Sequence, residues 1–192
     1  ELDKSLMFEP NKIEQALQIA LAGQDTAIKL IKDAFEEISL EISNNAMRPI
    51  SSFLFIGPKI CGKTYTAKII TSTLCPENPK QLLILQLDHL KKSYDLSYLV
   101  GAAPGLIGHE RQGVLFEFIE TYSQGVILLE NFDQCHIEIQ NYLLNILKEC
   151  FAIDNHGRRA FFNNYIFVIT ILDVSINEKV LNSSFSDQKD LD

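Results

Sequence analysis

Two hydrophobic patterns alternate along the chain, and each predicts its own kind of element. Apolar residues spaced three and four apart predict amphipathic helices, and short uninterrupted apolar runs predict buried strands. The helical pattern covers residues 13–21 and 27–38, which are separated by Gly23, then 63–74, 110–122 and 139–147. The apolar runs are "FLFI" (53–56), "LLILQL" (82–87), "GVILLE" (125–130) and "YIFVITIL" (165–172).

This alternation of helices with fully apolar strands predicts the fold class. Strands that are apolar on both faces are typical of a parallel sheet covered by helices on each side. We therefore predict an α/β fold, a three-layer αβα sandwich with a mainly parallel sheet.

The first strand and the next helix are joined by "GPKICGKT" (57–64), which fits the phosphate-loop pattern G-x-x-x-x-G-K-[ST]. Glycines let backbone N–H groups face an anion, and the helix N-terminus adds positive potential. Lys63 would reach the β- and γ-phosphates, and Thr64 would ligate Mg²⁺. A chance match is the alternative, and the strand–loop–helix context weakens it. The candidate nucleotide-binding residues are Gly57, Pro58, Lys59, Ile60, Cys61, Gly62, Lys63, Thr64 and Tyr65.

Composition narrows the class of protein. The 192 residues suffice for one sizeable domain, and a net charge of −8 argues against a nucleic-acid binder or a protein of anionic membranes. The four cysteines show no C-x-x-C pair and no zinc-site spacing, so we expect free thiols. Because no apolar run approaches the roughly 20 residues that span a bilayer, and no signal peptide is visible, we predict a cytoplasmic protein.

Several further segments, in order, resemble the second ATPase module of the Clp unfoldases and disaggregases in the AAA+ superfamily. The likeness covers most of the chain, from about residue 23 to 170. It is carried by "GQDTAIKLI" (23–31), "RPISSFLFIGP" (48–58), "LVGAAPGLIGHERQGVL" (99–115), "GVILLENFDQCH" (125–136), "NYLLNILKE" (141–149) and "DNHGRRAFFNN" (154–164).

The resemblance implies a P-loop NTPase large subdomain that is followed, in the family, by a small helical lid. It implies ATP or ADP with Mg²⁺ as ligands, a polypeptide substrate or partner protein, and a ring that only the full-length protein would form. We expect a helical linker over 1–22, the nucleotide-binding large subdomain over 23–175 and a polar tail over 176–192. The family's lid, fifth strand and arginine finger have no counterpart in 173–192. Leu21 and Ala22 align with residues that hold the adenine, although core packing is an alternative role.

The catalytic positions depart from the family pattern. Where the third strand of the family ends in Asp-Glu, this chain has Glu130 and Asn131. Glu130 keeps the charge that holds Mg²⁺ through water but is one methylene longer. Asn131 cannot accept the proton of an attacking water, as the family's general base does. The alternative is that both are ordinary strand-end residues and that Asp133 supplies a carboxylate.

Three other departures follow from the same comparison. The family's polar sensor becomes "TIL" (170–172), and we expect Leu172 to pack in the core. The pore-loop Gly-Tyr-Val-Gly becomes "GLIG" (105–108), in which Leu106 would grip a polypeptide less firmly than Tyr. Ile60 stands where the family prefers Gly, and a positive φ there would be strained. Arg158 and Arg159 would face a neighbouring subunit or form a solvated turn.

These observations favour an ATP-binding AAA+ domain with impaired hydrolysis, acting in nucleotide-dependent assembly or protein remodelling. An active ATP-hydrolysing unfoldase is one alternative, and a structural pseudo-ATPase that binds no nucleotide is another. A different P-loop enzyme, such as a nucleotide kinase or a small GTPase, is disfavoured by the Clp-like segments and by the lack of an N-K-x-D stretch.

Overall fold

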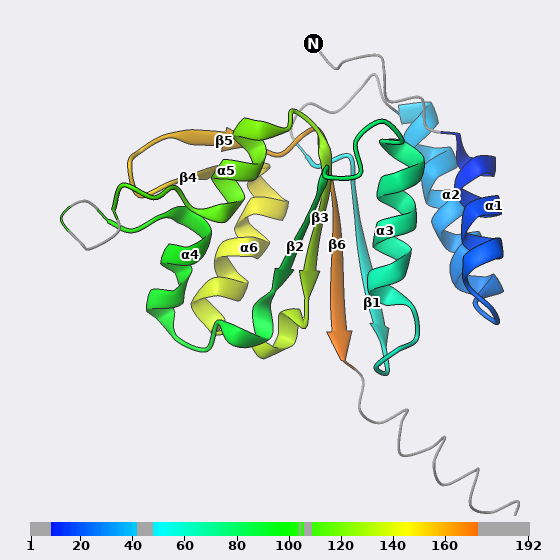
Figure 1. Ribbon diagram of the computed structural model, residues 1–192, viewed down its shortest axis with the longest axis horizontal. Coiled ribbons are helices and arrows are strands. Elements are labelled where there is room, and N and C mark those ends of the chain that lie inside the picture. Colours follow the sequence, from blue (N-terminus) through cyan, green and yellow to red (C-terminus); the bar gives the residue numbers. More distant parts are fainter. Residues whose placement is uncertain (1–8, 42–47, 104, 106–108, 173–192) are drawn as a thin grey trace, which may run out of the picture.

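The computed structural model describes residues 9–41, 48–103, 105 and 109–172. Its main sheet is parallel and contains β1 (Ser51–Gly57), β2 (Leu82–Gln86), β3 (Gly125–Glu130) and β6 (Tyr165–Leu172), in the order β1-β6-β3-β2. The four apolar runs thus form the strands of one sheet, as predicted, and helices lie on both of its faces (Figure 1). The α/β sandwich is confirmed.

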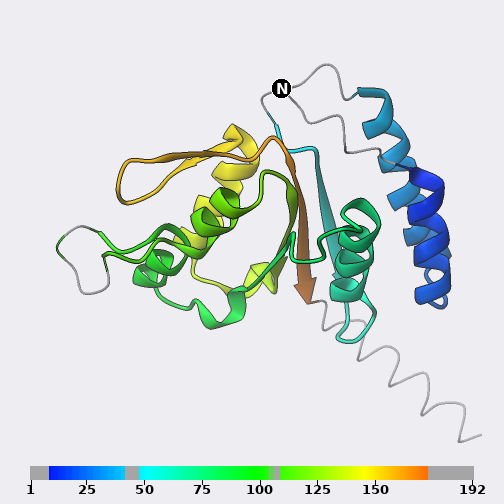
Figure 2. The same ribbon diagram turned by 45° about the horizontal axis from the view of Figure 1, so that its top comes forward.

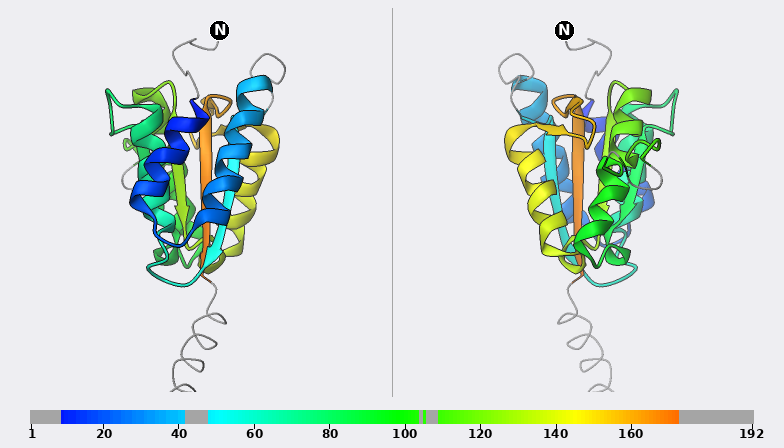
Figure 3. Two further views of the ribbon diagram at one scale, coloured as in Figure 1. Left: turned by 90° about the vertical axis from the view of Figure 1, so that its right-hand side faces the viewer. Right: turned by 90° about the vertical axis from the view of Figure 1, so that its left-hand side faces the viewer.

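One face of the sheet is covered by α1 (Pro10–Ala20), α2 (Asp25–Glu41) and α3 (Lys63–Leu74), and α1 and α2 lie in front in the left view of Figure 3. Gly23 separates α1 from α2, as the sequence predicts. Ile13 and Leu17 of α1 are fully buried in one core with Phe35 of α2. The predicted boundary at residue 22, between a linker and the nucleotide-binding domain, stays a prediction. Helix α1 packs into the same core as α2.

The opposite face carries α4 (Leu96–Val100), α5 (Val114–Thr121) and α6 (Ile137–Glu149). The fully buried side chains of this second core include Leu115, Leu143, Phe162 and Phe167. Short 3₁₀ turns, η1 (Leu87–His89), η2 (Ser93–Asp95) and η3 (Phe132–Gln134), connect its elements. Within the part of the chain that the structure describes, no helix is long and apolar enough to cross a membrane.

Two predicted boundaries are wrong. Leu87 opens η1 instead of ending β2, and the helix expected from residue 110 begins at Val114. Gly113 explains the later start, because it sits against the end of α4. A Cβ added at Gly113 would lie 2.2 Å from the Leu99 carbonyl oxygen and 2.4 Å from the Gly101 nitrogen.

A β-hairpin that the sequence analysis did not find follows α6. Its strands β4 (Phe151–Ile153) and β5 (Arg159–Phe161) are antiparallel, and the hairpin extends beside α5 (Figure 2). Each strand has three residues, and only the central alanines, Ala152 and Ala160, are buried. So short an alternation is too weak a signal to separate from a loop.

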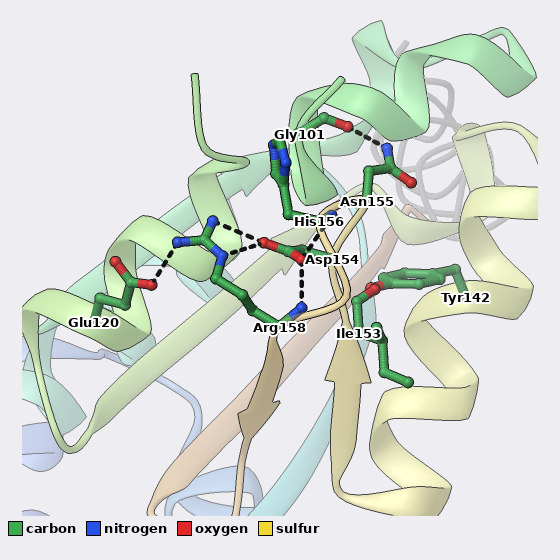
Figure 4. Close-up of polar contacts among 8 residues, drawn as sticks. All are labelled: Gly101, Glu120, Tyr142, Ile153, Asp154, Asn155, His156 and Arg158. Carbon is green, nitrogen blue, oxygen red and sulfur yellow. Dashed lines mark hydrogen bonds and ion pairs between the residues drawn. The ribbon is translucent and has the colours of Figure 1, made fainter. Parts of the chain in front are cut away.

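A buried carboxylate at the hairpin tip organises this turn (Figure 4). Asp154 accepts hydrogen bonds from the backbone N–H groups of His156 and Arg158, and from the Arg158 guanidinium at 2.7 Å. Arg158 also pairs with Glu120 of α5, while Asn155 donates to the Gly101 carbonyl. Arg158 is therefore part of a network within the domain and is still exposed, so whether it faces a neighbouring subunit or simply forms a solvated turn stays a prediction.

We predict that Asp154→Asn lowers the free energy of unfolding by about 2 kcal/mol at pH 7, since charge-assisted hydrogen bonds are lost. Burial alone raises the pKa of Asp154, but the hydrogen bonds and charge of Arg158, with the His156 amide, outweigh burial and lower it. The charged form thus stabilises the fold fully above the unfolded-state pKa of about 3.9, and this contribution is lost as pH falls through the folded value. Urea unfolding between pH 7 and pH 3 should show the gap between the two proteins narrowing only below about pH 4. A gap that stays constant over this range would contradict the assignment.

Candidate nucleotide-binding site

The candidate site lies at the carboxyl ends of the parallel strands, where the loop between β1 and α3 meets the ends of β3 and β6. A cavity of about 770 Å³ opens there. Ligands of open α/β sheets bind at this edge because loops and helix N-termini converge on it. The cavity is lined by loop residues 59–65 together with Ala20, Leu21, Ala22, Gln24, Glu130, Asn131, Thr170 and Leu172.

The loop backbone has the left-handed residues that a phosphate loop requires. Ile60 has φ 67°, so the condition under which a β-branched residue would be strained here is met, and its side chain is fully exposed. Gly62, at the N-cap of α3, has φ 95°. A Cβ at Gly62 would lie 2.8 Å from Leu21 Cδ2, the end of a flexible side chain that can move away, so the positive φ is what favours glycine there.

Lys63 is folded over the loop from the first position of α3. Its Nζ donates hydrogen bonds to the carbonyl oxygens of Gly57, at 2.7 Å, and Pro58, at 2.6 Å, and lies 3.5 Å from Cys61 Sγ. These contacts keep the ammonium beside the loop and at the wall of the cavity. A phosphate oxygen entering the loop would compete with the two carbonyls for this donor.

Thr64 and Glu130 are far apart in the sequence and in contact in the structure. The Thr64 hydroxyl, in the first turn of α3, donates a hydrogen bond to Glu130 Oε1 at the end of β3. Hydroxyl and carboxylate oxygens are the hard ligands that Mg²⁺ binds beside nucleotide phosphates. The two residues expected to hold the metal thus form a donor set that fits Mg²⁺.

Asn131 follows Glu130 in a left-handed conformation, with φ 54°, which asparagine tolerates better than most residues. Its N–H donates to Oγ1 of the buried Thr170, at 3.1 Å, which fixes the sharp turn after β3. The residue lines the cavity, and its neutral amide cannot accept a proton. Asp133, the alternative carboxylate, is exposed on η3 and is not one of the cavity-lining residues.

The remaining candidates fall into three groups. Leu21, Ala22 and the half-exposed Tyr65 line the cavity, as the resemblance implies. Leu172 does too, and it is only half-buried, so the expectation that it packs in the core is wrong: β6 ends at the rim of the cavity, beyond the buried layer. The predicted pore-loop residues 106–108 lie outside the described residues.

The sequence analysis missed three parts of the site, Ala20, Gln24 and Thr170. Gln24 lies in the segment "GQDTAIKLI", but nothing in the sequence indicated that it would line the cavity. Its position beside the loop depends on how α1 and α2 pack. Thr170 was noted as part of the sensor stretch, but its hydrogen bond to Asn131 depends on the pairing of β3 with β6.

Comparison with known proteins agrees with this geometry. Residues 48–185 match the AAA domain (Cdc48 subfamily). The chain belongs to this AAA family. The AAA domain is 38% identical over 154 residues to the chaperone protein ClpB of Malacoplasma penetrans, an alignment covering 80% of this chain and 22% of that protein.

Two further relatives are also named chaperone protein ClpB. Identity is 36% over 158 residues with the protein of Helicobacter hepaticus, covering 82% of this chain and 18% of that protein. Identity with the protein of Mycoplasmoides gallisepticum is also 36%, over 172 residues that cover 88% of this chain and 24% of that protein. The AAA domain described here is thus similar to one segment of these chaperones and spans about a fifth of the length of these curated relatives.

Proposed function

We propose that this AAA domain binds ATP or ADP with Mg²⁺ at residues 57–64 and hydrolyses ATP poorly. The observation that supports nucleotide binding is that four features meet at one cavity. They are the loop, the N-terminus of α3, Lys63 and the Thr64–Glu130 pair. Loop amides and the helix N-terminus favour an anion, Lys63 supplies a charge-assisted donor, and the oxygen pair suits the metal.

The proposal that hydrolysis is poor rests on Asn131. In-line attack on a γ-phosphate needs a residue that orients the water and accepts its proton. Asn131 occupies the place beside Glu130 where that residue is expected, and it is neutral. Leu172, also at the cavity, adds an apolar surface where the resemblance implies a polar sensor.

We propose a role in nucleotide-dependent assembly or protein remodelling within a longer protein. The curated relatives are named chaperones, and each is about five times the length that this chain matches. A ring and a polypeptide substrate would belong to that longer protein. Cys61, Cys75, Cys135 and Cys150 are free thiols, which fits the proposed cytoplasmic location.

The test is calorimetric titration with Mg-ATP of the wild type, Lys63→Ala and Lys68→Ala. Lys68 is the matched control, because it is an exposed lysine on the same helix outside the cavity. We expect Lys63→Ala to raise the Kd about 10- to 100-fold, the loss of one charge-assisted hydrogen-bond donor, while Lys68→Ala leaves it unchanged.

Two results would contradict the proposal. One is equal affinity of the wild type and Lys63→Ala. The other is a lack of any binding heat for the wild type at millimolar ATP, which would favour a purely structural domain.

A further inference from the structure

The β4–β5 hairpin turns an apolar face outward. Ala152 pairs with Ala160 at its centre, and both are buried, so their neighbours along each strand point to the opposite face. The four outward residues are Phe151, Ile153, Arg159 and Phe161. Ile153 is 44% exposed and Phe161 is 60% exposed, which is unusual for large apolar side chains that stand together on one face.

Three of the outward side chains are in contact with one another. The rings of Phe151 and Phe161 pair across the two strands, with centroids 6.5 Å apart. The guanidinium of Arg159 lies over the Phe151 ring, 5.7 Å from its centroid. Within the part of the chain that the structure describes, no carboxylate forms an ion pair with Arg159, whereas Arg158 has two acidic partners. The face thus combines aromatic surface with a cation that is available to an external carboxylate.

The outer edge of β5 carries backbone groups that do not pair with β4. The N–H of Phe162 donates to the Cys150 carbonyl at 2.9 Å, so every second residue of this strand faces β4. Residues of an antiparallel strand direct their backbone groups alternately to its two edges, so those of Arg159 and Phe161 point away from β4. A cavity of about 320 Å³ lies along this edge, and its lining residues come from β5 and from α5.

These features fit an extended segment of another protein. Such a segment would pair with the edge of β5, and its alternate side chains would fall beside Arg159 and Phe161. A carboxylate is the complement of Arg159, and an apolar side chain two positions away is the complement of Phe161. A second copy of this chain fits less well, because the outward face holds no carboxylate to meet Arg159 in a symmetric pair.

We propose that the outer edge and outward face of the β4–β5 hairpin dock an extended segment of a partner protein, in which an acidic and an apolar residue stand two positions apart. The hairpin lies at the end of the sheet opposite the phosphate loop (Figure 1), and its cavity shares no residue with the candidate nucleotide site. Docking therefore requires no nucleotide, and it can fail or succeed separately from the proposed function.

The first test compares two fluorescein-labelled synthetic peptides. One consists of valine and threonine with glutamate and phenylalanine two positions apart, and the other has lysine in place of glutamate. Fluorescence anisotropy measures the affinity of the whole chain for each. The acidic peptide should bind at least about 10-fold more tightly, the scale of one charge-assisted hydrogen bond. Arg159→Glu should reverse this preference, and Arg111→Glu, at an exposed arginine outside the cavity, should keep it.

The second test addresses the strand geometry. Alternate N–H groups of an added strand point toward β5 and away from it. Methylation of one alternate set of backbone nitrogens in the acidic peptide should therefore abolish binding, and methylation of the other set should leave it unchanged. Phe161→Ser should weaken binding of the acidic peptide about 10-fold, because an apolar contact is lost. Thermal unfolding checks that each variant is folded.

Three results would overturn the proposal: equal affinity of the wild type for the two peptides, no binding of the acidic peptide at millimolar concentration, and binding that tolerates both methylated sets. A wild type that dimerises in sedimentation velocity, beside a monomeric Phe161→Ser, would assign the face to a second copy instead. The peptide comparisons need only the wild type, so a variant that fails to fold leaves them decisive. Loss of nucleotide binding would leave this proposal standing.

Discussion

Asn131→Glu should hydrolyse ATP at least about 10²-fold faster than Asn131→Gln, the low end of what a positioned general base contributes. Position 131 lines the cavity directly after Glu130, on a turn that the Thr170 hydroxyl holds in place. A carboxylate added there stands beside the bound γ-phosphate in our proposal, where it can take the proton of the attacking water. Phosphate release under saturating Mg-ATP measures the difference.

The glutamine variant makes this comparison specific. Both variants place a longer side chain on a residue with φ 54°, so both pay the same backbone strain, about 1 kcal/mol. They have the same length and differ in whether the side chain can accept a proton. Equal phosphate release by the two variants would show that Asn131 is not what limits hydrolysis.

Gly113→Ala should lower the free energy of unfolding by about 3 kcal/mol or more, at the upper end of what overpacking costs. The φ of Gly113 is −68°, which alanine adopts freely, so backbone preference is not the cause. The cause is space: the added Cβ would overlap backbone atoms of Leu99 and Gly101, which cannot rotate away as a side chain could. The end of α4 and the start of α5 would have to separate.

Gly157→Ala is the matched control for this prediction. Gly157 has φ 79°, and a Cβ there meets nothing within 4 Å, so only the left-handed backbone is penalised, by about 1–2 kcal/mol. For a domain of this size, thermal unfolding should place Gly113→Ala about 6–12 °C below the wild type and Gly157→Ala about 2–8 °C below it. A Gly113→Ala protein as stable as Gly157→Ala would contradict the close packing of α4 on α5.

Much of the fold could be predicted from the sequence because its strands and helices have strong local patterns of apolar residues. A run such as "YIFVITIL" is rich in β-branched and aromatic residues and has almost no polar position, which favours a strand buried on both faces. The phosphate loop could also be predicted, because its glycines, lysine and threonine have a fixed spacing between a strand and a helix.

The features that were missed depend on contacts between distant segments. The start of α5 is set by the approach of Gly113 to Leu99, which leaves no mark on the helical periodicity. The sequence analysis did not single out Asp154 in "DNHGRR", because its burial follows from how the hairpin packs. Leu172 was apolar and was assigned to the core, but it falls where β6 leaves the buried layer. The contact of Thr64 with Glu130, 66 residues away, needed the sheet order.

The central claim is that the domain binds ATP at residues 57–64 and hydrolyses it poorly. The most direct test is to incubate the chain with Mg²⁺ and ATP labelled at the γ-phosphate and on the adenine. The protein is separated from free nucleotide at intervals, and the bound nucleotide is identified. The account predicts bound ATP that keeps both labels over many minutes, and much less bound ATP on Lys63→Ala. Bound ADP within the first interval, or protein that retains no nucleotide, would contradict it.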